Sequence, residues 1–412
     1  MTASLAGGLR HRYFVSLRYA GYRRFLGAQL LSSTGTWIHL AAETWLLARL
    51  GAGGLGLGVT VALQFGPILL LGPAGGAVAD RFDRRRLLLV TQPLLAAVAA
   101  GLALLVHLDA ARIWTVWVAA VVTGVLLTVD GPARMAFAAE LVDAEHLANS
   151  AALANAVAVS ARALGPAVSG LLIAGAGVAA CFLGNALSYL AVVAVLLGVH
   201  RRRTTADPPE PSRRSGLVRE GLRHAARDPV LRAVLGMMTV VGVFGLNFQL
   251  LITLLATDTF GASARWFGAL MSALGVGMVL GSLLSAGWHR PSPGGVAVLA
   301  VMTGATHAAT GFAPNPWLGL AALAALGTAA GMFLASAAGV LQRRAGDAMR
   351  GRVMALYSVA FLGTGVVGGP LIGWVADTAG VTVAYVTGGA CCALAVLLAV
   401  PAAGPVRTGD GG

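Results

Sequence analysis

The chain has 412 residues, of which 57% are hydrophobic and only 11% are charged, and its mean hydropathy is +0.80. A composition this apolar excludes a soluble globular protein, and because the net charge of +13 is not gathered on one soluble face, nucleic-acid binding is excluded as well. The sequence also lacks the short alternating segments of a β-barrel, so it predicts an all-α membrane protein.

Apolar runs long enough to cross a membrane recur along the whole chain. A hydrocarbon core of about 30 Å needs roughly 20 apolar residues in a helix. About twelve such spans are predicted, at Phe25–Ala48, Val59–Ala79, Leu87–Val106, Trp114–Val129, Ala151–Ala174, Val178–Val199, Ala233–Ala256, Phe267–Trp288, Val296–Phe312, Trp317–Ala335, Val353–Val375 and Thr382–Val400.

The arginines predict the orientation of the chain. All 29 basic residues are arginine, and no cleavable signal pattern precedes the first span, only Arg10, Arg12, Arg18, Arg23 and Arg24. If both termini are cytoplasmic, 25 of the 29 arginines lie on the cytoplasmic side, which is the positive-inside pattern. We therefore expect a multi-pass protein of a bacterial plasma membrane with cytoplasmic N- and C-termini.

The first expected span contains a carboxylate. A charge at the centre of a membrane helix costs at least about 2.5 to 3.5 kcal/mol, so Glu43 in span 1 and Arg162 in span 5 are candidate functional residues. His39 stands four residues before Glu43 and shares its helix face. Two interpretations stay open: Glu43 binds a proton or a cationic substrate, or it forms a structural ion pair with Arg162. His39 alone is more typical of a hydrogen-bonded helix residue.

Between spans 2 and 3, six of the seven positions from 80 to 86 carry a charge. Orientation alone explains the arginines of this inner loop, but it does not explain Gly76 or Asp80. The string GGAVADRFDRRR resembles the loop 2–3 signature of the major facilitator superfamily, with Asp83 in place of the second glycine of that signature.

Three more segments extend this resemblance over residues 18–400. They are GPARMAF after Asp130, ARALGPAVSG at 161–170 and RGRVMALY at 350–357, and they resemble the bacterial drug, macrolide and siderophore exporter branch, the enterobactin-exporter-like group. The resemblance implies two six-helix halves around a central cavity, working by alternating access. The related exporters carry glutamine near Glu43, so this residue does not inherit a family role.

The resemblance also implies a gate at the cytoplasmic end, formed by Gly76, Asp80, Arg81, Arg84, Asp130 and Arg134. Asp80 is expected to meet the N-terminal end of span 11, whose helix dipole favours an anion. Arg84 is expected to pair with an acid below span 4, for which Asp130 is the first candidate and Glu140 the alternate. Such a cluster would hold the gate shut in the outward-facing state.

Two polar segments divide the chain into domains. Residues 200–229 hold eight arginines, four acids and the piece DPPEPSRR, so they cannot form a span. They are expected to be a cytoplasmic linker whose second part is an amphipathic helix, either at the anionic inner leaflet or solvated. The predicted domains are therefore an N-terminal bundle at 1–199, the linker, a C-terminal bundle at 230–402 and a cytoplasmic tail at 403–412.

The two halves show traces of duplication. Gly165 and Pro166 in span 5 recur as Gly369 and Pro370 in span 11, at an offset of 204 that is close to half the chain. These pairs and Gly170 are predicted to let helices approach and slide, and the resemblance links the span 5 pair to antiporters. At the same offset of 204, Glu43 corresponds to Asn247, and Gln249 lies nearby in the sequence. The resemblance implies that the first helices of both halves line the cavity.

Other chemistry finds no support in the sequence. A nucleotide-binding lysine loop is impossible because the chain has no lysine, and the glycines at 363–368 that match GxGxxG lie inside a span. Cys181, Cys391 and Cys392 have no histidine or carboxylate at metal-ligand spacing. We therefore expect neither an enzyme nor a cofactor or metal site.

These observations favour a secondary transporter. We expect proton-coupled efflux of a hydrophobic or amphipathic small molecule, such as a drug, an antibiotic, a siderophore or a secondary metabolite, by a monomer in the lipid bilayer. Two alternatives stay open, namely proton-coupled or facilitative uptake with the same fold, and a membrane sensor or scaffold that transports nothing. The sensor would tolerate substitution of Glu43, whereas a coupled transporter would not.

Overall fold

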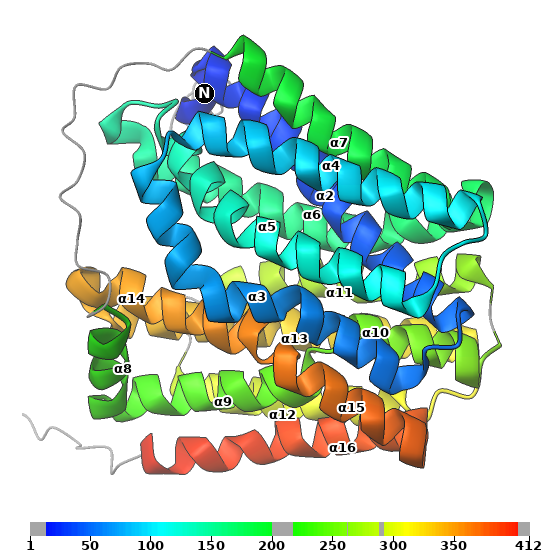
Figure 1. The fold of residues 1–412 in the computed structure, drawn as a ribbon. Coiled ribbons are helices and arrows are strands. Elements are labelled where there is room, and N and C mark those ends of the chain that lie inside the picture. The colour runs from blue at the N-terminus through cyan, green and yellow to red at the C-terminus, as the bar shows by residue number, and fades with distance from the viewer. Residues whose placement is uncertain (1–13, 200–216, 262, 288–291, 403–412) are drawn as a thin grey trace, which may run out of the picture. The chain divides into compact units, whose positions relative to one another are not determined.

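The computed structural model describes residues 14–199, 217–261, 263–287 and 292–402, and these residues form helices joined by short loops, with no strand among them (Figure 1). Arg10, Arg12, the DPPEPSRR piece and the tail at 403–412 lie outside the described residues. The all-α fold expected from the composition is confirmed.

Six long helices form the first part of the chain. After the short turn η1 (Val15–Arg18) come α2 (Ala20–Arg49), α3 (Gly53–Arg81), α4 (Arg84–His107), α5 (Ile113–Ala139), the turn η2 (Ala144–His146), α6 (Leu147–Ala176) and α7 (Val178–Gly198). Each of the first six expected spans falls on one of these helices. Apart from α7, these helices extend beyond the apolar runs on which they lie.

The second part begins with a short polar helix, which lies in the expected linker. The elements are α8 (Leu217–Arg227), α9 (Pro229–Gly245), α10 (Phe248–Leu254) with the π turn η4 (Leu255–Thr259), α11 (Ala264–Ala286), α12 (Pro293–Thr310), α13 (Pro316–Arg344), α14 (Gly346–Ser358) with the π turn η5 (Val359–Gly363), α15 (Gly365–Ala379), α16 (Val381–Leu394) and η6 (Ala395–Ala402). The remaining six expected spans fall on these helices.

Ten helical segments of the described chain are long and apolar enough to cross a membrane. The expected spans 1 and 9 correspond to α2, of 30 residues, and α12, of 18 residues, which are not among the ten. Both helices bury several polar side chains, including Glu43 on α2 and His307 on α12, and these lower their hydropathy.

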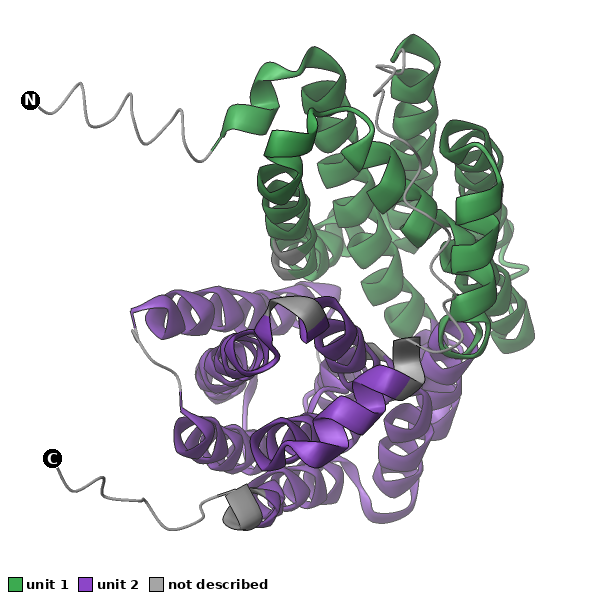
Figure 2. Cartoon of the chain, turned by 90° about the vertical axis from the view of Figure 1, so that its left-hand side faces the viewer, with its two compact units in different colours: residues 1–46, 66–210 green, residues 47–65, 211–412 purple. Residues whose placement is uncertain are grey.

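The described residues form two compact units (Figure 2). Unit 1 contains residues up to 46 and 66–210, and unit 2 contains 47–65 and 211 onward. The helix α3 therefore contributes its first part to unit 2 and its second part to unit 1. The domain limits drawn from the sequence at 199 and 230 stay a prediction.

Each unit has its own apolar core. In unit 1 the core includes Tyr22, Phe25, Leu88, Phe137 and Leu196. In unit 2 it includes residues of α9, α12, α13 and α16, such as Leu231, Met237, Leu299, Phe333 and Cys392. Large apolar side chains are exposed on the outer faces of most helices, as expected where the surrounding solvent is lipid.

Glycines allow α11 and α13 of unit 2 to pack backbone against backbone. A methyl group added to Gly277 or Gly281 would meet backbone carbonyl oxygens of α13, and one added to Gly327 or Gly331 would meet carbonyl oxygens of α11. The close approach is reciprocal, with two small residues on each helix spaced four apart. This is the small-residue packing that membrane helices use in place of a hydrophobic driving force.

Asp377 of α15 fixes the start of α3 within unit 2. Its Oδ1 accepts a hydrogen bond from the backbone N–H of Gly54 at 2.5 Å, and its Oδ2 accepts one from the N–H of Leu55 at 2.8 Å. The carboxylate thus satisfies two of the backbone donors that the first turn of α3 leaves free.

Asp228 caps the start of α9. Its Oδ1 accepts from the backbone N–H of Val230 at 2.8 Å and of Leu231 at 3.2 Å, and its Oδ2 accepts from Arg344 Nε at 2.7 Å. Partial burial alone would raise the pKa of Asp228, but the bonds from Arg344 and from the two backbone groups outweigh it, so the pKa lies below its ordinary value.

The glycine packing predicts that Gly277→Ala lowers the thermal unfolding midpoint of the protein in detergent, because the added methyl meets the backbone of α13. Overpacking of this kind costs about 1 to 3 kcal/mol. The matched control is Gly101→Ala on α4, where a methyl meets nothing within 4 Å. That variant should unfold at the wild-type temperature or slightly above it. Equal midpoints for the two variants would contradict the packing.

The cap predicts a pH-dependent loss of stability for Asp228→Ala. Because the pKa of Asp228 is lowered in the folded state, its stabilisation is complete above the ordinary value of 3.8 and is lost as the pH falls through the folded pKa. The unfolding midpoint of Asp228→Ala should therefore lie below that of wild type at pH 7, by about 1 kcal/mol of stability. The difference between the unfolding midpoints of wild type and Asp228→Ala should become smaller below pH 3.8. A gap that is constant with pH would contradict the ionic part of the cap.

Candidate functional site

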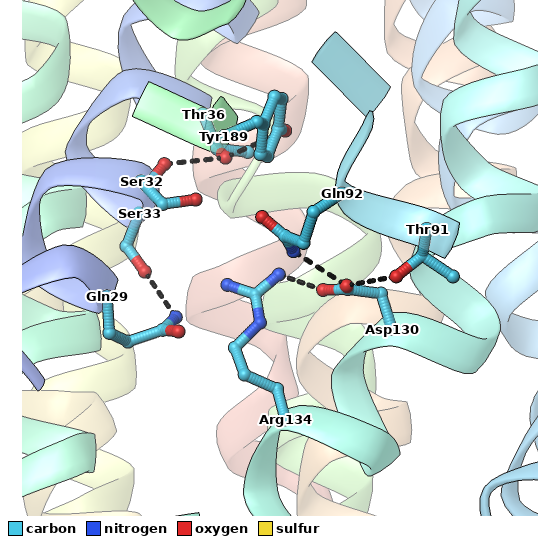
Figure 3. A network of polar contacts seen from close by, with 9 residues as sticks. All are labelled: Gln29, Ser32, Ser33, Thr36, Thr91, Gln92, Asp130, Arg134 and Tyr189. Carbon is cyan, nitrogen blue, oxygen red and sulfur yellow. Dashed lines mark hydrogen bonds and ion pairs between the residues drawn. The ribbon is translucent and has the colours of Figure 1, made fainter. Parts of the chain in front are cut away.

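A network of polar side chains lies inside unit 1 and is centred on Asp130 of α5 (Figure 3). Asp130 is 0% exposed, and its Oδ1 accepts hydrogen bonds from Thr91 Oγ1 and Gln92 Nε2 of α4, both at 2.7 Å. Its Oδ2 forms an ion pair with Arg134, one helical turn further along α5. All three donors stabilise the ionised carboxylate, so the buried charge is compensated.

The structure corrects the expected partner of Arg84. Arg84 Nη1 lies 3.3 Å from Glu140 Oε1, which was the alternate candidate, and not beside Asp130. The reason is that α5 continues to Ala139, more than two turns beyond Asp130, so Asp130 lies within the helix bundle. Arg134 stands on the same helix face as Asp130 and forms an ion pair with its Oδ2.

The loop between α3 and α4 is tied down by contacts that the sequence analysis missed. Asp83 is the N-cap of α4, and its side chain accepts a hydrogen bond from the N–H of Arg86 at 2.9 Å. Arg85 donates to the carbonyls of Leu196 and Leu197 at 2.8 and 3.3 Å, at the C-terminal end of α7. An aspartate just before a helix is a readable N-cap signal, whereas the Arg85 contact depends on which helix end lies nearby.

The other residues of the loop 2–3 signature lie at the end of α3. Asp80 and Arg81 are exposed in its last turn, and Gly76 is buried one turn before them. Its neighbour Gly75 lies directly against the backbone of Thr128 on α5. The expected contact of Asp80 with span 11 stays a prediction.

Glu43 lies on α2 among the most buried residues of unit 1. Its side chain is 2% exposed, and Oε1 has no hydrogen-bond partner among the described residues. His39, one turn earlier, is 5% exposed; its ring packs edge-on against Phe182 of α7 at 4.7 Å between centroids, and its Nδ1 also has no partner there. An ionised carboxyl group in such a place would lack a hydrogen bond at Oε1 from the described residues, which makes its charge costly.

The expected ion pair between Glu43 and Arg162 does not form within the described residues. The guanidinium of Arg162 on α6 instead lies 5.0 Å from the centre of the Trp37 ring. The cause is the packing of α6 on α2, because Gly165 sits directly against the Cβ of Trp37 and so fixes the depth of Arg162. Trp37 precedes Glu43 by six residues, about 9 Å along the helix.

The two Gly-Pro pairs both lie inside helices. Pro166 is within α6 and Pro370 within α15, where each removes one backbone hydrogen bond. Gly369 lies against the backbone of Gly58 on α3, within unit 2, and Gly170 is buried on α6. Gly165 and Gly369 therefore each sit at a point where two helices approach closely.

Asn247 and Gln249 lie where span 7 is interrupted in unit 2. Asn247 stands in the two-residue break between α9 and α10, and its Nδ2 donates to the carbonyl of Val243 at 2.7 Å. The Nε2 of Gln249 is buried and has no hydrogen-bond partner among the described residues. Whether these residues meet Glu43 across a cavity stays a prediction.

No group of three or more histidine, cysteine, aspartate or glutamate side chains that could hold a metal ion occurs in the described part of the chain. The three cysteines are free thiols on α7 and α16.

Comparison with known proteins places the chain among transporters. A family model described as transmembrane secretion effector matches residues 12–410. The chain is 26% identical to the uncharacterized MFS-type transporter YfiS of Bacillus subtilis over 63% of its own length and 62% of the relative. It is 26% identical to the staphyloferrin A transporter of Staphylococcus aureus, again over 63% of its own length and 65% of the relative. These two alignments thus span less than two thirds of the relatives.

The enterobactin exporter EntS of Shigella flexneri is 25% identical to the chain, over 77% of the chain and 75% of the exporter. Among solved structures, the D-xylose-proton symporter superimposes with a TM-score of 0.69 at 16% identity, covering 93% of this chain and 97% of that one. The likeness to the symporter concerns the fold alone.

The two acid and arginine pairs of unit 1 predict a ranking of stability losses. Asp130→Asn leaves Arg134 with an uncompensated charge in the bundle, which should cost about 3 to 5 kcal/mol. Glu140→Gln removes a partly exposed pair and should cost about 0.2 to 1 kcal/mol. Unfolding midpoints of the two variants in detergent measure the difference. The reverse order would contradict the assignment of Glu140 to Arg84.

Proposed function

The chain belongs to the transmembrane secretion effector family, within the major facilitator superfamily, and we propose that it is a secondary transporter that exports a small molecule in exchange for protons. Transport is by alternating access, and the cargo is hydrophobic or amphipathic. The arginine distribution supports a location in a bacterial plasma membrane with cytoplasmic termini.

The observation that carries this proposal is the state of Glu43. Its carboxyl group is buried on a membrane helix, and its Oε1 has no partner among the described residues. Because an uncompensated charge is expensive inside a membrane, the group is favoured with a bound proton and releases that proton only when water or a cation reaches it. A group that must exchange its proton with water to become charged is suited to couple proton entry to conformational change.

The contrast with Asp130 supports the assignment. Asp130 is equally buried, but Arg134, Thr91 and Gln92 all donate to its carboxylate, so a buried negative charge there is compensated. At Glu43, by contrast, Oε1 has no donor among the described residues. Of these two buried carboxyl groups, Glu43 is therefore the one suited to bind and release a proton.

The relatives support the direction and the class of cargo. One relative is named an enterobactin exporter and another a staphyloferrin A transporter. We therefore place siderophores first among the cargoes to test, followed by antibiotics and other secondary metabolites. The cytoplasmic gate of this proposal consists of Asp80 and Arg81 at the end of α3, together with the Arg84 and Glu140 pair.

Reconstituted protein tests the role of Glu43. Purified wild type and Glu43→Gln are placed in liposomes with an internal pH dye, a pH gradient is imposed, and a panel of siderophores and lipophilic compounds is added. Wild type should move protons only when a substrate is present. Glu43→Gln should lose about tenfold or more of this movement, because glutamine cannot carry a proton across the membrane.

The matched control is Glu145→Gln, since the side chain of Glu145 is 75% exposed in the η2 turn. It should transport like wild type. Unchanged proton movement in Glu43→Gln would refute the coupling role. Substrate movement without proton movement in wild type would favour facilitative transport, and movement toward the inside would favour uptake.

A further inference from the structure

Five polar residues form a stripe along one face of α2. Gln29, Ser32, Thr36, His39 and Glu43 follow one another at spacings of three, four, three and four residues. At about 100° per residue, these positions fall within about 80° of the helix circumference and extend over about 21 Å along its axis. We call them the α2 stripe.

Most of the stripe has unsatisfied hydrogen-bonding atoms. Gln29 Oε1, Ser32 Oγ, His39 Nδ1 and Glu43 Oε1 are all buried and have no hydrogen-bond partner among the described residues. Buried polar atoms in proteins are nearly always hydrogen-bonded, and where protein groups do not serve them, ordered water does. A single such atom calls for one water, but four on one helix face, two on each side of Thr36, call for a line of waters.

The stripe is linked to the Asp130 network through Tyr189, whose hydroxyl lies 3.1 Å from Thr36 Oγ1 and which lies within electrostatic range of Asp130 and Arg134. Figure 3 shows the Gln92 side chain and the Arg134 guanidinium turned toward the side of the network where Ser32 and Ser33 lie. Gln92 Oε1 and Arg134 Nε are also buried without a hydrogen-bond partner among the described residues. The side chain of Arg134 is 15% exposed, so the network is not sealed there.

The neighbouring helices supply the remaining groups that face the stripe. From α7, the Tyr189 hydroxyl lies 3.1 Å from Thr36 Oγ1, and Phe182 covers His39. On α5, Asp130 and Arg134 lie within electrostatic range of Tyr189, and they are joined to Thr91 and Gln92 of α4, neither of which titrates. From α6, Arg162 lies over Trp37, on the flank of the stripe.

We propose that the α2 stripe carries a chain of ordered waters that passes protons between Glu43 and the Asp130–Arg134 pair. This inference rests on the proposed function, because it takes Glu43 as the proton-binding group. In the transfer, the Glu43 carboxyl gives its proton to the first water, each water passes one proton on, and one proton leaves at the other end. No bond other than O–H is broken, and Glu43 remains as a carboxylate until it is reprotonated.

Asp130 and Arg134 have separate parts in this path. The carboxylate of Asp130 is fixed in place by its three donors, and a negative charge there favours a passing positive charge. The guanidinium of Arg134 neutralises that charge at rest, so the proton does not become trapped there. The pair therefore forms the exit of the path at the end of α5 that leads to Glu140, which the arginine distribution assigns to the cytoplasm.

Thr36 is the position that tests the path, because it lies midway along the stripe and its hydroxyl is its one polar side-chain group. Thr36→Val keeps the shape of the side chain and removes the hydroxyl. We expect substrate-dependent proton movement to fall about fivefold, because a line of waters loses one of its few fixed partners. Substrate counterflow without a pH gradient should be unchanged, since it requires no net proton transfer. Thr36→Ser, which restores a hydroxyl, should restore proton movement.

The matched control is Thr303→Val on α12 of unit 2. Thr303 is fully buried and donates to the carbonyl of Leu299 at 2.8 Å, much as Thr36 donates to the carbonyl of Ser32 at 2.9 Å. It should leave both assays unchanged. Ser32→Ala is the second test variant, because it removes a hydroxyl oxygen that makes no hydrogen bond to any described residue, so folding should not suffer.

The outcomes separate this inference from the function on which it rests. If Glu43→Gln loses proton movement while Thr36→Val and Ser32→Ala keep it, Glu43 couples transport but the path is refuted. If Thr36→Val loses counterflow and proton movement equally, the stripe is merely structural and the path is refuted again. If Glu43→Gln moves protons normally, the proposed function fails first, and the path fails with it.

Discussion

Hydrocarbon offers no hydrogen bonds, and this constraint shapes the whole molecule. Every backbone group in a span must find its partner within the chain, which leaves the helix as the structure of each passage. Charges are accordingly gathered at helix ends, where they also serve the backbone, as Asp377, Asp228, Asp83 and Arg85 do for the free ends of α3, α9, α4 and α7. A charged side chain inside a span either has hydrogen-bond and ion-pair partners that compensate its charge, or lacks them because it has a function there.

Asp130 and Glu43 of unit 1 illustrate these two cases. Asp130 has three donors for its two oxygens, so removing its negative charge would strand Arg134. Glu43 has a buried oxygen that no described residue serves. The same carboxyl group is thus fully hydrogen-bonded at Asp130 and has an unserved oxygen at Glu43, which is why we propose Glu43 as the proton-binding group. The two carboxyl groups differ in the hydrogen-bond donors around them and not in their own chemistry.

The helices could be predicted from the sequence because each apolar run is longer than any competing structure allows, and all twelve expected spans fall on helices. Which side chains pair with one another could not be predicted from the sequence. Arg84 has Glu140 as its partner because α5 continues two turns beyond Asp130, and helix ends are weakly encoded in sequence. Arg162 lies over Trp37 because Gly165 sets the contact between α6 and α2, a relation between helices that no single run of residues encodes.

The helices α2 and α12 both bury polar side chains, but they differ in how many of these side chains lack a hydrogen-bond partner. On α12, Thr303 and Thr310 donate to carbonyls of their own helix, and the ring nitrogens of His307 have no hydrogen-bond partner among the described residues. His307 faces Tyr385, whose hydroxyl is equally unserved, so one or two waters can satisfy this isolated place. The stripe on α2 has such groups at Gln29, Ser32, His39 and Glu43, and unserved polar atoms repeated along a helix lower the stability of the bundle. Natural sequences break the rules of core composition mainly where function requires it, and a row that ends at a carboxyl group fits the transfer of protons better than it fits packing.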